Sequence, residues 1–302
     1  AGGLRGNSRI PVNITEAEGM VAEVVIDGLT GGHSGAEIDK IRANANKLMG
    51  RYLYELSKIT AFTISGLEGG TKDNAITRKT GAVLVIDPDC EEEVKVFSGK
   101  FQENLRKEYS GTDAGITVSV KMKGIDTIAA VDMTSREKII FFLMNVPYGI
   151  EKMSGEIEGL VETSNNIGIL KLEEDALYAS CGVRSSFGSA KLHVSDQICY
   201  LTEFLGGEYH THGDYPAWEY KKDSRLREIM SEVYKNMFNK EPVVKAIHAG
   251  LECGLFYDSI PGLDCVSFGP NMKDIHTTEE KLSISSTAIM WDYLVKVLEE
   301  IH

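Results

Sequence analysis

A single histidine near the end of the chain has the setting of a metal ligand. His276 lies in GPNMKDIHTTEEKL (269–282), a loop that a Gly-Pro turn opens and an amphipathic helix follows. Such a loop can hold a neutral imidazole at a fixed angle, as a zinc site requires. A pair of zinc ions needs about five such ligands, mostly carboxylates and imidazoles. The rest of the chain does not obviously supply them, so His276 is predicted to be one ligand of a site completed by something larger.

Three further polar residues stand at turns or strand ends, and each has a structural alternative. His33 lies in GGHSG (31–35), where glycines let the backbone bend and leave the imidazole able to donate to an oxyanion; it could equally cap the following helix. Asn74, in the loop GGTKDNAIT, could bind a carboxylate or a carbonyl, or satisfy its own loop as an Asx-turn. Arg184, in CGVRSS, could grip a substrate carboxylate with both arms of its guanidinium, or form a surface ion pair.

Two short-range pairs are weaker candidates. His248 and Glu252 stand at i and i+4, a spacing that can hold a metal on a helix. His210 and His212 alternate along an expected strand and therefore face one side. Pairs of this kind are more often incidental. The sequence contains no P-loop, GxSxG, HExxH or convincing dinucleotide motif.

The composition is that of a globular protein and narrows the range of partners. The chain has 302 residues, of which 42% are hydrophobic and 25% charged, and its formal net charge is −13. This acidic balance argues against nucleic acid or an anionic membrane as a partner. The longest apolar runs are too short to span a bilayer. Five widely spaced cysteines without a CxxC pair favour the reducing cytoplasm.

The elements that must position these residues follow from hydrophobic periodicity. Residues 20–123 are expected to have the order βαββαβ, the ferredoxin-like pattern, with the first helix over 36–57. Residues 134–213 are expected to have the order αββαβ, a second half of the same kind.

Beyond residue 213 the expected order is β-α-β-α-β-α, with strands at 243–247 and 264–268. Such a thin α/β piece leaves a sheet edge that needs a partner. The opening AGGLRGNSRI is typical of the exit of a strand rather than a natural start. We therefore expect the natural chain to continue upstream of Ala1.

Taken together, these segments resemble the M20 metallopeptidases, and most of all the aminoacyl-histidine (Xaa-His) dipeptidases. The likeness covers nearly the whole chain and keeps the family's order. It is carried by GGHSGAEIDKIRANANKL, GGTKDNAITRK, VETSNNIGIL, the Arg184 strand, GDYPAW, IHAGLECGLF and GPNMKDIHTTEEKLSI.

The resemblance implies a fold class and a division into domains. In that family a lid domain interrupts a catalytic domain that holds two zinc ions. The resemblance implies an α+β lid of two ferredoxin-like βαββαβ-type halves, followed by the C-terminal half of an α/β zinc-peptidase catalytic domain. Residues 1–18 would be a remnant of the catalytic domain, 19–206 the lid, and 207–302 the second half of the catalytic domain.

The resemblance also implies roles for single residues. His276 would be the last metal ligand, His33 would stabilise the tetrahedral intermediate, and Asn74 and Arg184 would contact the substrate. The family's other ligands and its general base belong to the N-terminal half, which would lie before Ala1. Two Zn²⁺ are expected in the complete enzyme, with Mn²⁺ or Co²⁺ acceptable to the same ligands, and the 302-residue chain alone is expected to bind none tightly.

The expected function is that of a cytoplasmic dipeptidase that hydrolyses Xaa-His dipeptides with a metal-activated water. The chain alone is expected to be inactive. Its expected partners are the dipeptide, the missing N-terminal half and, as an option, a second copy in a homodimer. Two alternatives stay open: a related M20 amidohydrolase or aminopeptidase with another substrate preference, and a non-catalytic dimerising module.

Overall fold

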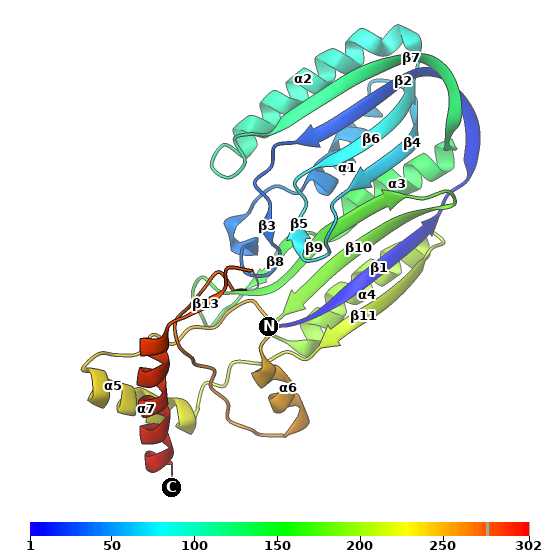
Figure 1. The fold of residues 1–302 in the computed structure, drawn as a ribbon. Coiled ribbons are helices and arrows are strands. Elements are labelled where there is room, and N and C mark those ends of the chain that lie inside the picture. The colour runs from blue at the N-terminus through cyan, green and yellow to red at the C-terminus, as the bar shows by residue number, and fades with distance from the viewer. Residues whose placement is uncertain (276–277, 302) are drawn as a thin grey trace.

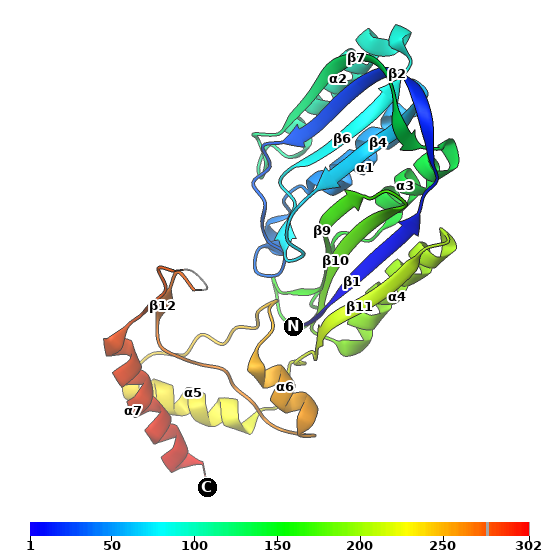
Figure 2. The ribbon, with the colours of Figure 1, turned by 45° about the vertical axis from the view of Figure 1, so that its right-hand side comes forward.

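The computed structural model describes residues 1–275 and 278–301. The largest part of the fold is one antiparallel sheet with helices on one face (Figures 1 and 2). The strands described run in the order β11 (Glu208–Tyr215), β1 (Gly2–Pro11), β10 (Ala176–Ser185), β9 (Val161–Leu172), β4 (Phe62–Gly69), β6 (Thr80–Ile86), β2 (Ile14–Asp27) and β7 (Thr117–Val131), with β8 (Gly149–Met153) beside β9. The covering helices are α1 (Ala45–Leu56), α2 (Glu91–Glu108), α3 (Met133–Asn145) and α4 (Gly188–Phe204).

The sheet consists of two ferredoxin-like units that share an edge. In the first unit, β2-α1-β4-β6-α2-β7, the strands lie in the order β7-β2-β6-β4. In the second, β1-α3-β9-β10-α4-β11, they lie in the equivalent order β11-β1-β10-β9. The first unit is thus inserted between β1 and α3 of the second. The sequence showed no first strand directly before the second half, because that strand is residues 2–11 and the whole first unit separates it from α3.

The segment 1–18 does not stand apart from this sheet. Strand β1 pairs with β10 on one side and with β11 on the other, and β11 lies beyond the expected division at 206/207. The boundaries at 18/19 and 206/207 stay predictions about domains, but the sheet itself runs across both of them.

The expected helix over 36–57 is broken into two pieces. A single 3-10 turn, η1 (Ile38–Lys40), ends at Ile41, whose φ of 52° is left-handed. The chain then extends to Asn44, whose side chain accepts from the backbone amides of Asn46 at 2.9 Å and Lys47 at 3.3 Å and so caps α1. Apolar periodicity does not reveal the break, because Ile41 fits the helical spacing although its side chain is 71% exposed.

Buried amides join the two units at their shared edge. Strands β4 and β9 pair only at Glu68–Lys171 and Gly69–Leu170. Beside that short contact, the Asn44 side chain donates to Asn166 Oδ1 at 3.1 Å and to the carbonyl of Ile167 at 3.0 Å. The Asn46 side chain donates to the same carbonyl at 3.2 Å. Satisfied buried polar groups specify one arrangement, so α1 of the first unit is fastened to β9 of the second.

The C-terminal part is thinner than the sequence predicted. It holds α5 (Arg225–Phe238), α6 (Glu252–Ser259), α7 (Ile284–Glu300) and a hairpin of β12 (Met272–Lys273) and β13 (Lys281–Leu282). Helices α5 and α7 pack through Met230, Val233, Tyr293 and Val297. Among the described residues, no helix combines the length and the apolar character needed to cross a bilayer.

The strands predicted at 243–247 and 264–268 are wrong. Both segments are irregular, and Val243 is 79% exposed. A strand exists only where a neighbour completes its backbone hydrogen bonds. Within the described part of the chain, neither segment lies beside such a neighbour, so apolar residues alone were not sufficient.

Candidate substrate-binding site

A small cavity at one end of the second unit brings Asn74 and Arg184 together. Its volume is about 70 Å³, and its lining also includes Arg5, Ser34 and Tyr215. Arg184 is near the end of β10, and Asn74 comes from the loop between β4 and β6. Two residues that are 110 positions apart in the sequence therefore face one space.

The loops of His33 and Asn74 form one paired unit. The short strands β3 (Gly32–His33) and β5 (Ala75–Ile76) are antiparallel, with His33 opposite Ala75. The backbone amide of Ser34 then donates to the carbonyl of Asn74 at 2.9 Å. Backbone hydrogen bonds thus hold the two loops side by side.

The Asn74 loop rests on β9 and is held there by a buried amide. The Asn166 side chain donates to the carbonyls on either side of Asn74, at 3.3 Å to Asp73 and at 2.9 Å to Ala75. The close approach also needs Gly168, since a Cβ there would lie 2.5 Å from the carbonyl oxygen of Asp73. The loop is positioned by these contacts, and an Asx-turn within itself is not what holds it.

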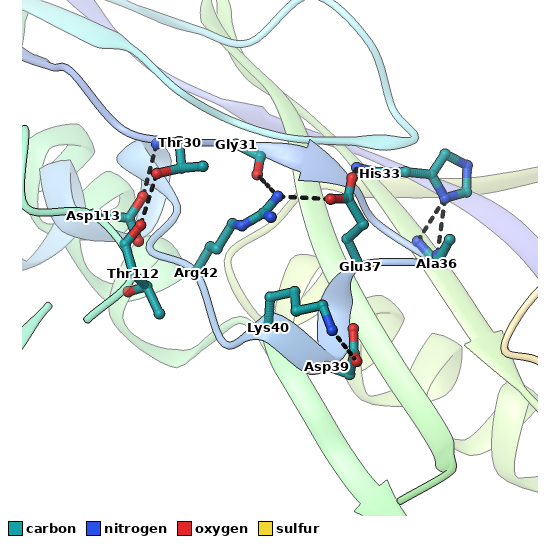
Figure 3. Close-up of polar contacts among 11 residues, drawn as sticks. Thr30, Gly31, His33, Ala36, Glu37, Asp39, Lys40, Arg42, Thr112 and Asp113 are labelled. Carbon is teal, nitrogen blue, oxygen red and sulfur yellow. Dashed lines mark hydrogen bonds and ion pairs between the residues drawn. The ribbon is translucent and has the colours of Figure 1, made fainter. Parts of the chain in front are cut away.

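The turn after His33 selects the tautomer of its neutral ring (Figure 3). His33 Nδ1 accepts from the backbone amides of Gly35 at 3.2 Å and Ala36 at 3.0 Å. The ring therefore caps the turn at 34–37, where the structural alternative had expected the start of a helix. Because Nδ1 is an acceptor, we assign the proton of the neutral imidazole to Nε2, which makes that nitrogen a donor.

A carboxylate and a guanidinium hold the His33 backbone (Figure 3). Glu37 Oε2 accepts from the His33 amide at 2.8 Å, and Arg42 Nη1 bridges Glu37 Oε1 at 3.0 Å and the carbonyl of Gly31 at 2.5 Å. The amide of His33 lowers the pKa of Glu37 most, and Arg42 lowers it further. The glycine at 32 is needed because its φ is +139° and a Cβ would meet the Glu37 and Arg42 side chains.

Arg184 meets a phenol rather than the surface carboxylate of its structural alternative. Its Nη1 donates to the Tyr215 hydroxyl at 2.7 Å, and no carboxylate in the described ranges forms an ion pair with it. The other guanidinium of the cavity, Arg5, is paired with Asp73. The cavity therefore keeps one uncompensated positive charge in a chain whose net charge is −13, which suits an anionic ligand.

The histidines of the two weaker pairs lie outside this cavity and contact other side chains. His248 is 7% exposed, and its Nε2 lies 2.7 Å from Ser164 Oγ. Burial, together with the positive charges of the chain's amino terminus and Arg184, lowers the pKa of His248 to about 4. His210 and His212 do alternate along β11, where His212 Nδ1 lies 3.4 Å from the side-chain amide of Asn7.

The described residues do not by themselves fit a metal centre. No group of three or more His, Cys, Asp or Glu side chains among them is arranged to hold an ion. His276, the predicted ligand, lies outside the described residues.

Sequence reasoning missed Tyr215, Arg5 and Asp73 as members of the cavity. Tyr215 stands in GDYPAW, which served only as one segment of the family resemblance, and Arg5 lies in the N-terminal strand. Their meeting depends on the register of β11, β1 and β10, which local periodicity does not encode. The available signals were the DY dipeptide after Gly213 and the DN dipeptide in the Asn74 loop.

Known peptidases are similar to this chain. The M20 family model described as "Peptidase dimerisation domain" matches residues 25–113. The cytosol non-specific dipeptidase of Escherichia coli (strain K12) is 33% identical over 279 residues, which are 92% of this chain and 57% of that protein. The crystal structure of aminoacylhistidine dipeptidase from Vibrio alginolyticus matches with a TM-score of 0.94 at 30% identity, over 100% of this chain and 62% of that one.

The chain is similar to the M20 peptidases in sequence and in fold. Within them it is similar to dipeptidases, near the aminoacylhistidine (Xaa-His) dipeptidases, as the sequence motifs indicated. The predicted α+β fold is confirmed. The chain spans somewhat less than two thirds of the length of the two relatives.

Proposed function

We propose that this chain is the substrate-binding part of a cytoplasmic metallo-dipeptidase that acts on Xaa-His dipeptides. The observation that carries the proposal is the cavity that joins Asn74 and Arg184 beside the His33 loop. Its single unpaired positive charge suits the terminal carboxylate of a small peptide. In this proposal residues 19–206 are the lid, 1–18 and 207–302 belong to the catalytic domain, and the relatives' names supply the substrate class.

Each of the three residues has a distinct task. Arg184 holds the carboxylate of the dipeptide through charge-assisted hydrogen bonds. The Asn74 side-chain amide orients the peptide, because the contacts of the Asn74 loop with β9 hold this residue in place. The Nε2–H of His33 donates to the oxygen that becomes negative when the peptide carbonyl is attacked, and a donor already in place stabilises that charge without reorganisation.

The metals belong to the same proposal, through the family resemblance. Two Zn²⁺, or Mn²⁺ or Co²⁺, would activate the attacking water when bound. His276 would be one ligand, and the remaining ligands and the general base would come from the other part of the complete enzyme. The 302 residues alone would then turn over dipeptides negligibly.

Turnover on a panel of Xaa-His dipeptides tests the proposal. In the complete protein, His33→Ala should lower kcat by about 100-fold or more, as loss of an oxyanion donor does, with little change in KM. His193→Ala, an exposed histidine on α4, is the matched control. Preference for other dipeptides or for N-acyl amino acids would favour a related M20 amidohydrolase or aminopeptidase instead.

Calorimetry with Zn²⁺ tests the division of the site. The 302-residue chain should bind zinc only weakly, at about tens of micromolar or worse, because one imidazole is a poor site. Tight binding that His276→Ala abolishes would show that the other ligands lie within these residues, and dipeptide hydrolysis by this chain above the His276→Ala background would contradict the proposed inactivity.

The dimerisation-domain match favours a second role, as a homodimer-forming module. Light scattering on the chain tests it, and a strict monomer would argue against that role.

A further inference from the structure

Three neighbouring strands place Tyr215, Gly3 and Arg184 in one row across the sheet. Gly3 lies opposite Tyr215 in the β1–β11 pairing and opposite Arg184 in the β1–β10 pairing. Because Gly3 has no side chain, the tyrosine ring passes over it; a Cβ at Gly3 would lie 2.5 Å from the Tyr215 hydroxyl oxygen. That oxygen accepts a hydrogen bond from Arg184 Nη1 at 2.7 Å.

Tyr215 is held in this position from two further sides. Lys191 on α4 is only 4% exposed, and its Nζ donates to the Tyr215 carbonyl at 2.9 Å while it pairs with the neighbouring Asp214. The ring also packs against Gly250, where a Cβ would lie 2.7 Å from Tyr215 Cε2. A buried lysine and two glycines from different segments thus fix one phenol, which is the preorganisation a binding residue needs.

The direction of the Arg184 hydrogen bond leaves the phenolic hydrogen available. A guanidinium has donors only, so the Tyr215 hydroxyl is the acceptor toward Arg184 and its own hydrogen points elsewhere. Both side chains line the 70 Å³ cavity. The Asp73 carboxylate in that cavity is paired with Arg5. Two donors, one of them cationic, therefore face a space that suits a carboxylate.

We propose that Tyr215 is a substrate-binding residue whose hydroxyl donates to the terminal carboxylate that Arg184 holds. The identity of the ligand as a dipeptide rests on the function proposed above. Arg184 and Tyr215 would together distinguish a free C-terminus from an amidated one. A carboxylate accepts both hydrogen bonds, whereas a terminal amide presents an NH₂ group to one of the two donors and leaves that donor unpaired. Dipeptides should therefore bind and C-terminal dipeptide amides should not.

Nuclear magnetic resonance on the 302-residue chain tests this without any turnover. The chain is labelled with ¹³Cζ-tyrosine, and the Tyr215 signal is assigned by its loss in Tyr215→Phe. Glycyl-L-histidine should move that signal to saturation, whereas glycyl-L-histidine amide at the same concentrations should leave it in place. Tyr215→Phe should raise the Kd for the dipeptide about tenfold, as loss of a hydrogen bond to a charged group does.

Tyr209→Phe is the matched control, since Tyr209 lies on the same strand and its hydroxyl is 2.9 Å from Ser195 Oγ on α4. Its Kd should stay within about twofold of wild type. Should Tyr215→Phe fail to fold, Gly3→Ala places a methyl against the Tyr215 hydroxyl and should weaken dipeptide binding similarly.

Three results would overturn the inference: an equal response to the amide, an unchanged Kd in Tyr215→Phe, or no dipeptide binding. The proposed function is judged separately. If the complete protein turns over dipeptides but the Tyr215 signal does not move, the inference about Tyr215 is wrong and the proposed dipeptidase function is not affected. If the signal moves but the complete protein shows no turnover, the proposed function is wrong and the binding role of Tyr215 is not affected.

Discussion

His248 makes the stability of this fold depend on pH in a way that the structure quantifies. Burial lowers its pKa from an ordinary 6.5 to about 4, and its Nε2 lies 2.7 Å from Ser164 Oγ on β9. The difference between 6.5 and about 4 corresponds to about 3 kcal/mol, at 1.36 kcal/mol for each tenfold change in proton affinity. The residue is 7% exposed, so solvent screening removes little of this.

The sign follows from which state binds the proton first. When the pH falls below about 6.5, the unfolded chain protonates His248 while the folded chain keeps the ring neutral. The free energy of unfolding therefore has its full value above pH 6.5 and falls steadily toward pH 4. At pH 4.5 about 2.5 kcal/mol of the contribution should be lost.

Urea unfolding from pH 7.5 to 4.5 measures this in wild type and in His248→Asn. The variant lacks the imidazole and should be less stable than wild type at pH 7.5. Between pH 7.5 and 4.5, however, the decrease in its unfolding free energy should be about 2.5 kcal/mol smaller than the decrease in wild type. His210→Gln is the control, because the His210 side chain is 78% exposed, and it should follow wild type. Parallel curves for wild type and His248→Asn would refute the assignment of a buried neutral imidazole.

Two further predictions concern residues that hold the site's supports. Gly168→Ala should destabilise the fold by about 1–3 kcal/mol, because its Cβ would lie 2.5 Å from the carbonyl oxygen of Asp73; Gly99→Ala, in α2 with nothing within 4 Å, should instead stabilise by about 0.5–1 kcal/mol in the same urea melts. Asn44→Ala should cost about 2 kcal/mol or more, since it removes the cap of α1 and leaves buried partners unpaired. Ser283→Ala, the cap of α7, should cost about 1 kcal/mol, and equal losses for the two caps would show that the buried amide network contributes nothing.

The elements of the sheet could be predicted from the sequence because their signals are local. For example, Val118, Val120 and Met122 alternate along the sequence and lie in β7 (Thr117–Val131). Local patterns of this kind predict the βαββαβ order of the first unit. The second unit showed only αββαβ, because its first strand is separated from α3 by the whole first unit. The missing strand was present at residues 2–11, but which strands β1 would pair with depends on long-range contacts.

The failures in the C-terminal part have the same origin. Four of the five residues at 243–247 are apolar, as in a buried strand, yet Val243 and Val244 are 79% and 57% exposed. Side-chain type indicates that such a segment favours a sheet. Only hydrogen-bonded neighbours make it a strand, and a single segment does not specify them.

The candidate site shows how far residue types lead. His33, Asn74 and Arg184 could be chosen because glycines and strand ends surround them, and their chemistry needed no structure. What holds them is backbone: the β3–β5 pairing couples His33 to the Asn74 loop, and Asn166 supports that loop on β9. Gly3 is important because it has no side chain, and this leaves room for the Tyr215 ring to reach Arg184. A glycine that acts by lacking a side chain gives no chemical signal in the sequence. The contact between Tyr215 and Arg184 could therefore be found only from the register of three strands.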